Sequence, residues 1–362
     1  MAGELTIGTL LESEGAAPAR LLGEKLNRHT FWCGQSGSGK TYALGVALEQ
    51  ILLHTRLPLV ILDPNSDFVR LGELRGNAPS AEAQQLASRD IRVRRSIVGA
   101  ADPLRARFLS MPLRSRAAIL QIDPIFDADD YNTLLRMEAD ISLVADHDLV
   151  GFMRSHPDRI RHQLAMRLEN LGVADWSLWA WGQRSVTDDI DDQPDATVVD
   201  LGGFATPAES RAAALAVLDH LWENREQRIG RLVVIDEAHN LATPEPSTPV
   251  ARLLTERIVQ IAAEGRKYGL WLLLSTQRPS KVHPNALSQC DNLALMRMSS
   301  PRDLAELAEV FGYAPESLLA RSPTFAQGQA LFAGGFVDQP SLVQMGARLT
   351  HEGGSDVRVP LR

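Results

Sequence analysis

Short apolar runs alternate along the chain with longer stretches of helical periodicity. The longest runs are Leu57–Leu62, Leu232–Ile235 and Leu270–Leu274. Each is far shorter than the roughly 20 residues that a membrane-spanning helix needs, and such runs are typical of strands buried on both faces of a parallel sheet. We expect strands at 28–33, 59–63, 197–200, 231–236, 270–275 and 293–298, and helices at 40–54, 207–227, 250–268 and 301–311.

The middle of the chain has a different pattern. Residues 66–195 contain one candidate strand, Arg89–Val93, and are otherwise mostly helical in period with prolines as interruptions. We interpret this stretch as a helical insertion seated on a core made of residues 1–65 and 196–345, with a C-terminal tail at 346–362. Strands that alternate with helices predict an α/β fold with a mainly parallel sheet.

Composition narrows the class of protein. Of the 362 residues, 44% are hydrophobic and 23% are charged, which suits an ordinary packed core. The net charge of −8 argues against a broad basic face, so any nucleic-acid contact would be local. Cys33 and Cys290 form no metal-ligand pattern, and residues 1–15 lack the features of a signal peptide. We therefore expect a cytoplasmic protein without a membrane segment.

A glycine-rich segment carries the clearest chemical signal. It has the spacing of a P-loop and lies between a predicted strand and a predicted helix. Backbone N–H groups of such a loop point at phosphate oxygens, and the start of the next helix attracts the same anions. Lys40 would reach the β and γ phosphates, and Thr41 would bind Mg²⁺. The residues expected to bind ATP are Gly34, Gln35, Ser36, Gly37, Ser38, Gly39, Lys40 and Thr41.

Two of the apolar strands end in polar side chains. Asp236 and Glu237 follow Leu232–Ile235, and ligands of open α/β sheets gather at such carboxyl ends. We expect Asp236 to hold Mg²⁺ and Glu237 to orient and deprotonate the attacking water. Gln277 follows the strand at 270–275 and is placed to sense the γ phosphate or position the water. The alternative for Gln277 is a simple strand-end turn closed by Pro279.

Four other clusters each allow two interpretations. Arg266 and Lys267 end a predicted helix, where the helix dipole alone favours cations; the alternative is an arginine finger that acts in a neighbouring subunit's site. A cluster of acids forms either a solvated loop or a metal site: Asp188, Asp189, Asp191 and Asp192. Three tryptophans either pack locally or form a ligand platform: Trp176, Trp179 and Trp181. A segment rich in arginine either pairs with acids or contacts DNA: Arg89, Arg92, Arg94, Arg95, Arg105, Arg107, Arg114 and Arg116.

Two helicase-like families share parts of these motifs. Asp236-Glu237-Ala238-His239 spells the box of the DEAH helicases, but only 84 residues (362 − 278) follow Arg278, too few for their second domain. The stretch 264–291, with Glu-Gly-Arg-Lys-Tyr-Gly before a strand and Ser-Thr-Gln-Arg-Pro after it, resembles the HerA branch of the HerA/FtsK superfamily of hexameric ATPases. The segments that also resemble that family are Arg28-His29, Asp63-Pro64-Asn65, Asp67-Phe68, Val199-Asp200-Leu201, Gly328-Gln329-Ala330 and Pro340.

The resemblance covers about residues 20–345 and carries several expectations. It implies a RecA-like P-loop NTPase fold, a ring of six with ATP sites between subunits, and a pore through which DNA is pumped beside a nuclease or effector partner. Lys40, Thr41, Asp236, Glu237 and Gln277 would serve one chain's own site, and Arg266 would serve its neighbour's. HerA proteins usually begin with a small β-barrel, and the 33 residues before Gly34 are too few to form it.

Two functions follow from this reading. The first is a HerA-like motor, a DNA translocase or helicase that converts ATP and water to ADP and phosphate. The second is an ATPase switch subunit that gates a partner effector in a defence-type complex without processive DNA translocation. Transport at a membrane is a weaker third option, since the sequence offers no membrane segment.

Overall fold

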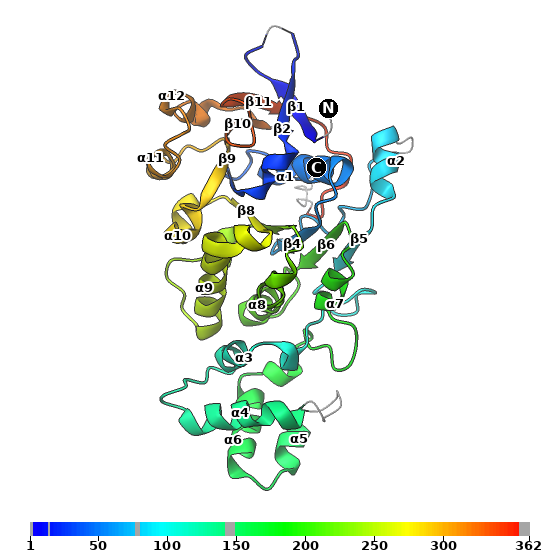
Figure 1. The fold of residues 1–362 in the computed structure, drawn as a ribbon, viewed down its shortest axis with the longest axis vertical. Coiled ribbons are helices and arrows are strands. Elements are labelled where there is room, and N and C mark those ends of the chain that lie inside the picture. Colours follow the sequence, from blue (N-terminus) through cyan, green and yellow to red (C-terminus); the bar gives the residue numbers. More distant parts are fainter. Residues whose placement is uncertain (1–2, 14, 77–79, 142–148, 355–362) are drawn as a thin grey trace, which may run out of the picture.

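A computed structural model describes residues 3–13, 15–76, 80–141 and 149–354. At its centre lies an 11-stranded sheet with the order β2-β1-β11-β10-β9-β3-β8-β7-β4-β6-β5 (Figure 1). From β9 to β5 neighbouring strands are parallel, and from β9 to β2 they are antiparallel. The expected α/β fold with a mainly parallel sheet is confirmed. The strands are Glu4–Leu10 (β1), Pro18–Leu22 (β2), His29–Cys33 (β3), Leu59–Asp63 (β4), Ile91–Arg94 (β5), Ala196–Asp200 (β6), Arg231–Ile235 (β7), Leu270–Thr276 (β8), Cys290–Met296 (β9), Gln329–Gly334 (β10) and Ser341–Met345 (β11).

Helices cover the sheet and extend beyond it. Alternate residues of each central strand face opposite sides, so the parallel strands bury apolar side chains on both faces. The helices are Lys40–His54 (α1), Ala81–Ala87 (α2), Leu113–Ile119 (α3), Ala128–Ile141 (α4), Leu149–Ser155 (α5), Arg159–Asn170 (α6), Val186–Asp191 (α7), Pro207–Glu223 (α8), Pro249–Glu264 (α9), Pro284–Leu287 (α10), Pro301–Val310 (α11) and Glu316–Leu319 (α12).

Two hydrophobic clusters hold these layers together. On one face Leu59 and Ile61 of β4 pack with α1 and the antiparallel strands. On the other face Val60 and Leu62 pack with α8, α9 and the helices α3 to α6. Figure 1 shows α4, α5 and α6 at the end of the molecule opposite the β1–β2 hairpin. The side chains of the strand that bears the P-loop are therefore fixed from both sides.

The region predicted as a helical insertion, residues 66–195, divides between the sheet and the helical end. Its strand β5 pairs in parallel with β6 at the edge of the sheet, and its helix α2 packs on α1. Residues that follow β5 lead into α3 to α6. Part of the predicted insertion thus continues the core, because β5 needs the hydrogen-bonding edge of β6. Within this region, residues 77–79 and 142–148 lie outside the described residues.

The chain's ends meet at the antiparallel edge. β1 pairs with both β2 and β11, so a hairpin precedes the P-loop strand and joins the last strand. Of the predicted tail, residues 346–354 pack along α1, and Leu74 forms a bridge with Thr350. The tail's residues 355–362 lie outside the described part. Across the described residues, no helix is long and apolar enough to cross a membrane.

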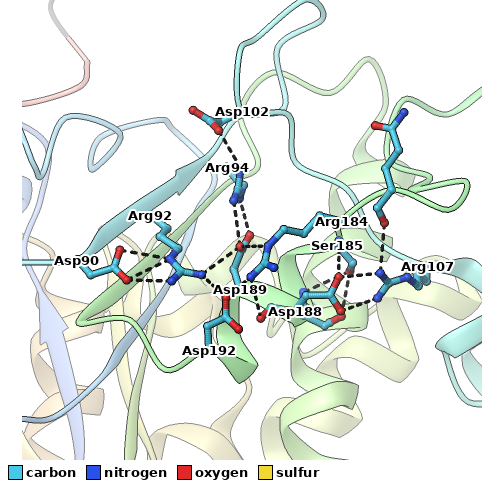
Figure 2. A network of polar contacts seen from close by, with 12 residues as sticks. Asp90, Arg92, Arg94, Asp102, Arg107, Arg184, Ser185, Asp188, Asp189 and Asp192 are labelled. Atoms are coloured by element: carbon cyan, nitrogen blue, oxygen red, sulfur yellow. Dashed lines mark hydrogen bonds and ion pairs between the residues drawn. The ribbon is translucent and has the colours of Figure 1, made fainter.

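A network of arginines and aspartates fastens α7 to β5 (Figure 2). Asp189 on α7 accepts hydrogen bonds from Arg94 at 2.6 and 2.9 Å and from Arg184 at 2.7 Å. Arg92 lies 2.7 Å from Asp192 and 2.9 Å from Asp90. Arg107 clamps Asp188 at 2.6 and 2.7 Å. These contacts support the interpretation in which the arginine-rich segment pairs with acids. The carboxylates of Asp188, Asp189 and Asp192 bind guanidinium groups, which argues against a metal site there.

The tryptophans of the helical end pack locally. Trp179 is buried, its Nε1 donates to the Val173 carbonyl at 2.6 Å, and its ring stacks on Trp176 with centroids 5.8 Å apart. Trp181 is half-buried and has a left-handed backbone, with φ of 38°. This arrangement favours the packing interpretation over a ligand platform.

Candidate functional site

The P-loop leaves the carboxyl end of β3 and leads directly into α1. Gly37 and Gly39 have φ of 74° and 87°, a region that side chains rarely adopt, so the loop needs glycine at both positions. A Cβ on Gly34 would lie 2.7 Å from that of Met296 on β9. Gly39 begins α1 without a capping side chain, which leaves the first N–H groups of the helix free for an anion. The loop therefore has the form of a phosphate cradle.

Lys40 joins this loop to the ends of two neighbouring strands. Its Nζ lies 2.8 Å from Asp236 Oδ1, 2.8 Å from Ser275 Oγ and 3.1 Å from Glu237 Oε1. Burial alone would lower the pKa of Lys40, but the charges of Asp236 and Glu237 raise it. The lysine is thus a fixed cation, and without a nucleotide the two carboxylates neutralise it.

Glu237 and Gln277 meet at the same edge of the sheet. Gln277 Nε2 donates to Glu237 Oε1 at 3.0 Å. Glu237 has φ of 43° and ψ of 49°, a left-handed conformation that costs a non-glycine residue on the order of 1 kcal/mol or more. His239 Nδ1 lies 3.2 Å from Glu237 Oε2 and 3.0 Å from Thr276 Oγ1, and burial lowers the pKa of His239, which keeps the ring neutral. Strain of this kind is typical of functional sites, where the surrounding contacts hold it in place.

Two further carboxylates lie beside Asp236. Single oxygens of Asp63, Asp67 and Asp236 all lie within 4.8 Å of one another. Burial raises the pKa of Asp63 to about 7, although the N–H groups of Phe68 and Asp67 oppose the rise. Burial and then Asp236 raise the pKa of Asp67 to about 6. Sequence reasoning did not assign Asp63 and Asp67 to the site, and the polar end of the strand Leu59–Asp63 was the signal that indicated them.

The donor set suits a hard divalent cation. Asp236 Oδ2 is fully buried and has no hydrogen-bond partner among the described residues. Mg²⁺ prefers oxygen ligands and is usually held by one or two carboxylates together with phosphate oxygens and water. An orphaned buried carboxylate oxygen next to a phosphate cradle therefore fits Mg²⁺, and both Thr41 and Asp67 line the cavity that opens over this cradle.

A cavity of about 1080 Å³ opens over the P-loop. One end is lined by the loop with Lys40, Thr41 and Gln277, and the rest by Tyr42, by Arg70 and Arg75, and by the segment 344–354. Its volume slightly exceeds the usual range for small-molecule sites, about 300–1,000 Å³. The cavity is large enough for a whole nucleotide.

Arg266 lies elsewhere. Arg266 precedes β8, whereas Gln277 follows that strand. A strand of seven residues at roughly 3.3 Å each therefore separates the two, and they lie at opposite ends of the parallel strands. Arg266 Nη1 donates to Asp291 Oδ2 at 2.5 Å, and Arg28 Nε lies 4.0 Å from the same oxygen. The structure thus brings together Lys40, Asp236, Glu237 and Gln277 and keeps Arg266 apart from them, next to Arg28.

Known proteins share parts of this chain's sequence. Residues 5–137 match the family model described as "Helicase HerA, central domain". A protein described as DNA double-strand break repair helicase HerA from Sulfurisphaera tokodaii is 32% identical over 114 residues, which are 32% of this chain and 22% of that protein. Its namesake from Pyrococcus furiosus is 30% identical over 114 residues, or 32% of this chain and 20% of that protein. The matches thus span less than a quarter of these relatives' length.

Solved structures share the fold over most of the chain. VirB4 of Thermoanaerobacter pseudethanolicus has a TM-score of 0.63 at 15% identity, with 96% of this chain and 97% of that chain covered. The plasmid coupling protein TrwB, solved in complex with the non-hydrolysable GTP analogue GDPNP, has a TM-score of 0.58 at 14% identity, with 96% and 90% covered. Residues 5–137 are thus similar in sequence to the central domain of HerA helicases, and the chain as a whole shares the fold of VirB4 and TrwB.

Proposed function

We propose that the chain is the ATP-hydrolysing subunit of a HerA-like motor that moves DNA through a ring. The observation that carries this proposal is the cluster of Lys40, Asp236, Glu237 and Gln277 at the mouth of the P-loop. A phosphate cradle, a fixed lysine and two carboxylates are the parts that in-line attack of water on a γ phosphate requires. The similarity to proteins described as HerA helicases supports DNA as the polymer that is moved.

The site's residues have distinct roles in this proposal. The P-loop N–H groups bind the phosphates, and Lys40 turns from Asp236 and Glu237 toward the β and γ phosphates. Thr41 and Asp236 would hold Mg²⁺, which would supply positive charge to the phosphate oxygens. Glu237, released by Lys40, accepts a proton from the attacking water, while Gln277 orients that water or senses the γ phosphate.

The proposal includes a second subunit at each site. Arg266 cannot serve its own chain's P-loop from the opposite edge of the sheet. In a ring of six, that edge would face the next subunit's nucleotide, where Arg266 would stabilise charge on the transferred phosphoryl group. Asp291, whose Oδ2 also lies 4.0 Å from Arg28 Nε, would hold the Arg266 guanidinium ready until the neighbour's ATP arrives. A nuclease or effector that accompanies the ring is part of the same proposal.

DNA-stimulated hydrolysis tests the motor. We expect ATP turnover to rise when duplex DNA is added at low salt and to lose this stimulation as salt increases, since phosphate contacts release counterions. Magnesium chelation should abolish turnover with or without DNA. A turnover rate that ignores DNA at low salt would exclude a DNA motor and leave only an ATPase.

One observation favours the alternative, an ATPase switch that gates a partner effector. The densest arginine segment is largely engaged by aspartates, so it offers DNA little free positive charge. In this case ATP would change the mass of the complex with the partner, while DNA would leave hydrolysis unchanged. Native mass measurement of the chain with and without ATP, alone and with the product of the neighbouring gene, separates the two functions.

A further inference from the structure

The cavity over the P-loop has two kinds of wall. The phosphate end is accounted for by the loop, Lys40 and the ends of β7 and β8. The remaining wall comes largely from a segment far away in sequence, Gln344 to Ala347 at the end of β11 and then His351, Glu352 and Gly354. A triphosphate bound at the first end would direct the sugar and base toward the rest of the lining, which also includes Tyr42, Arg70 and Arg75. No residue of this second wall belongs to the motifs discussed so far.

The segment Gly346–Gly354, named here the strap, follows α1 and then reaches the acidic end of β4. Its Arg348 N–H donates to Tyr42 Oη at 2.8 Å, one residue beyond Thr41 of the P-loop. Its His351 N–H donates to the Glu73 carbonyl, and its Gly353 N–H donates to the Asp67 carbonyl, both at 2.9 Å. The strap thus connects the start of α1 with the loop that carries Asp67.

A buried carboxylate fastens the strap. Glu49 of α1 is 1% exposed and accepts from Thr350 N–H at 2.9 Å, Thr350 Oγ1 at 2.6 Å and Leu349 N–H at 2.8 Å. Arg348 Nε lies 3.6 Å from the same carboxylate and is also buried. A carboxylate buried on a helix is expensive unless it is fully paired, so this cluster holds the backbone of the strap in one position.

The helix has a gap that admits the arginine. A Cβ on Gly45 would lie 2.6 Å from the guanidinium carbon and Nε of Arg348. Glycine inside a helix costs about 1 kcal/mol relative to alanine. Gly45 therefore lowers the stability of α1 at the point where Arg348 of the strap packs against it. Gly45 and Glu49 are one turn apart on α1, the helix that begins at the P-loop, and both contact the strap.

We propose that the strap is the nucleoside wall of the ATP site, with Glu49 and Gly45 as positioning residues. The inference rests on the proposed function in that it takes the cavity to hold a nucleoside triphosphate. The strap contacts the sugar and base through its backbone and through His351 and Glu352, and Glu49 sets its distance from the P-loop. The strap contributes binding, whereas Lys40, Asp236 and Glu237 contribute hydrolysis.

The test compares two buried carboxylates. Glu49→Gln leaves an amide where three donors and Arg348 need a carboxylate, so the strap shifts. The matched control is Asp219→Asn, because Asp219 is equally buried, accepts from Arg257 at 2.7 Å and Ser115 at 2.5 Å, and lies away from the cavity. We expect Glu49→Gln to weaken binding of the magnesium complex of a non-hydrolysable ATP analogue about tenfold, equivalent to about 1.4 kcal/mol, in calorimetric titration. Turnover at saturating ATP should stay within about twofold, and Asp219→Asn should leave affinity unchanged.

A second variant and a second measurement make the result independent of folding yield. Gly45→Ala should also weaken the analogue, because its methyl group displaces Arg348. In the wild-type chain, the analogue should slow hydrogen exchange at the amides of residues 348–353. Unchanged affinity in both strap variants, an equal loss in Asp219→Asn, or no slowing of exchange would overturn the role of the strap while leaving wild-type turnover intact. A wild-type chain that binds no nucleotide would overturn the proposed function as well.

Discussion

At the scale of single residues, the role of Glu237 as the general base gives the clearest prediction. Its carboxylate lies between Lys40 and Gln277, at 3.1 and 3.0 Å, and its backbone is held in a left-handed conformation. Glu237→Gln should retain ATP binding and lower turnover at least about a hundredfold, because the water loses its base. Single-turnover hydrolysis and equilibrium binding measure the two effects separately.

The control for this variant is Glu256→Gln on α9. Glu256 is half-exposed and pairs with Arg114 far from the P-loop, so its loss should leave turnover unchanged. If Glu237→Gln turned over at a near-normal rate, the general base would have to be another carboxylate of the site, and Asp67 would be the first candidate.

His29 makes a prediction about pH. It is buried in β3 and accepts from Leu272 N–H at 2.9 Å; burial and then Arg266 lower the pKa of His29 to about 4. Below about pH 6.5 His29 is protonated in the unfolded chain, but in the folded chain it stays neutral down to about pH 4. The free energy of unfolding therefore falls over this interval by up to about 3 kcal/mol.

The comparison is with His29→Gln, whose side chain has an acceptor for Leu272 but no charge to gain. The variant should be less stable than wild type at pH 7.5, and the gap should narrow toward pH 4. Urea unfolding at several pH values gives both curves. Parallel curves would mean that folding does not change the pKa of His29.

Much of the site could be predicted at this scale, because each strand delivers its polar residues next to one another in sequence. Lys40, Asp236 and Gln277 follow from spacing, and the structure brings them together. The contact between Glu49 and Arg348 could not be predicted, because the two residues are separated by nearly the whole chain and neither lies in a motif. A buried Glu in an otherwise apolar helix was its one local signal.

At the scale of elements, the arginine network between β5 and α7 is the feature with the sharpest consequence. Asp189 is fully buried and serves Arg94 and Arg184, with Arg92 at 3.4 Å. Asp189→Asn should destabilise the fold by about 2 kcal/mol, since it leaves cations without their partner. The loss, measured by thermal unfolding, should exceed that of Asp192→Asn, because Asp192 is exposed. Equal losses would mean that burial adds nothing to the network.

The central strands could be predicted, because short continuous apolar runs are typical of strands that are buried on both faces of a parallel sheet. The pairings at the two sheet edges could not. The expected strand Arg89–Val93 overlaps β5, but its place beside β6 could not be foreseen, because its alternating arginines resemble a solvated face until Asp189 and Asp192 pair with them. The β1–β2 hairpin was not predicted from the sequence, and it is held in place by its pairing with β11 and by the burial of Leu5, Ile7 and Leu21 beside α1.

At the scale of the whole molecule, Arg266 predicts how subunits depend on one another. Arg266→Ala should lower turnover without weakening ATP binding, because the residue lies at the opposite edge from its own P-loop. In mixtures of Arg266→Ala with Glu237→Gln subunits, turnover should partly recover, since some sites then combine an intact Glu237 with an intact neighbouring Arg266. A mixture that remains inactive at every ratio would place Arg266 in its own chain's site.

The joining of the chain's two ends has a consequence for synthesis. β1 is made before the P-loop, whereas its partner β11 and the strap beyond it are made after all the central strands. Domains form as the chain leaves the ribosome, so the P-loop, α1 and the central strands exist for a time without the wall that closes the nucleoside end. If the strap is the nucleoside wall, a nascent chain would acquire firm nucleotide binding only after residues 346–354 have been made and have packed on α1.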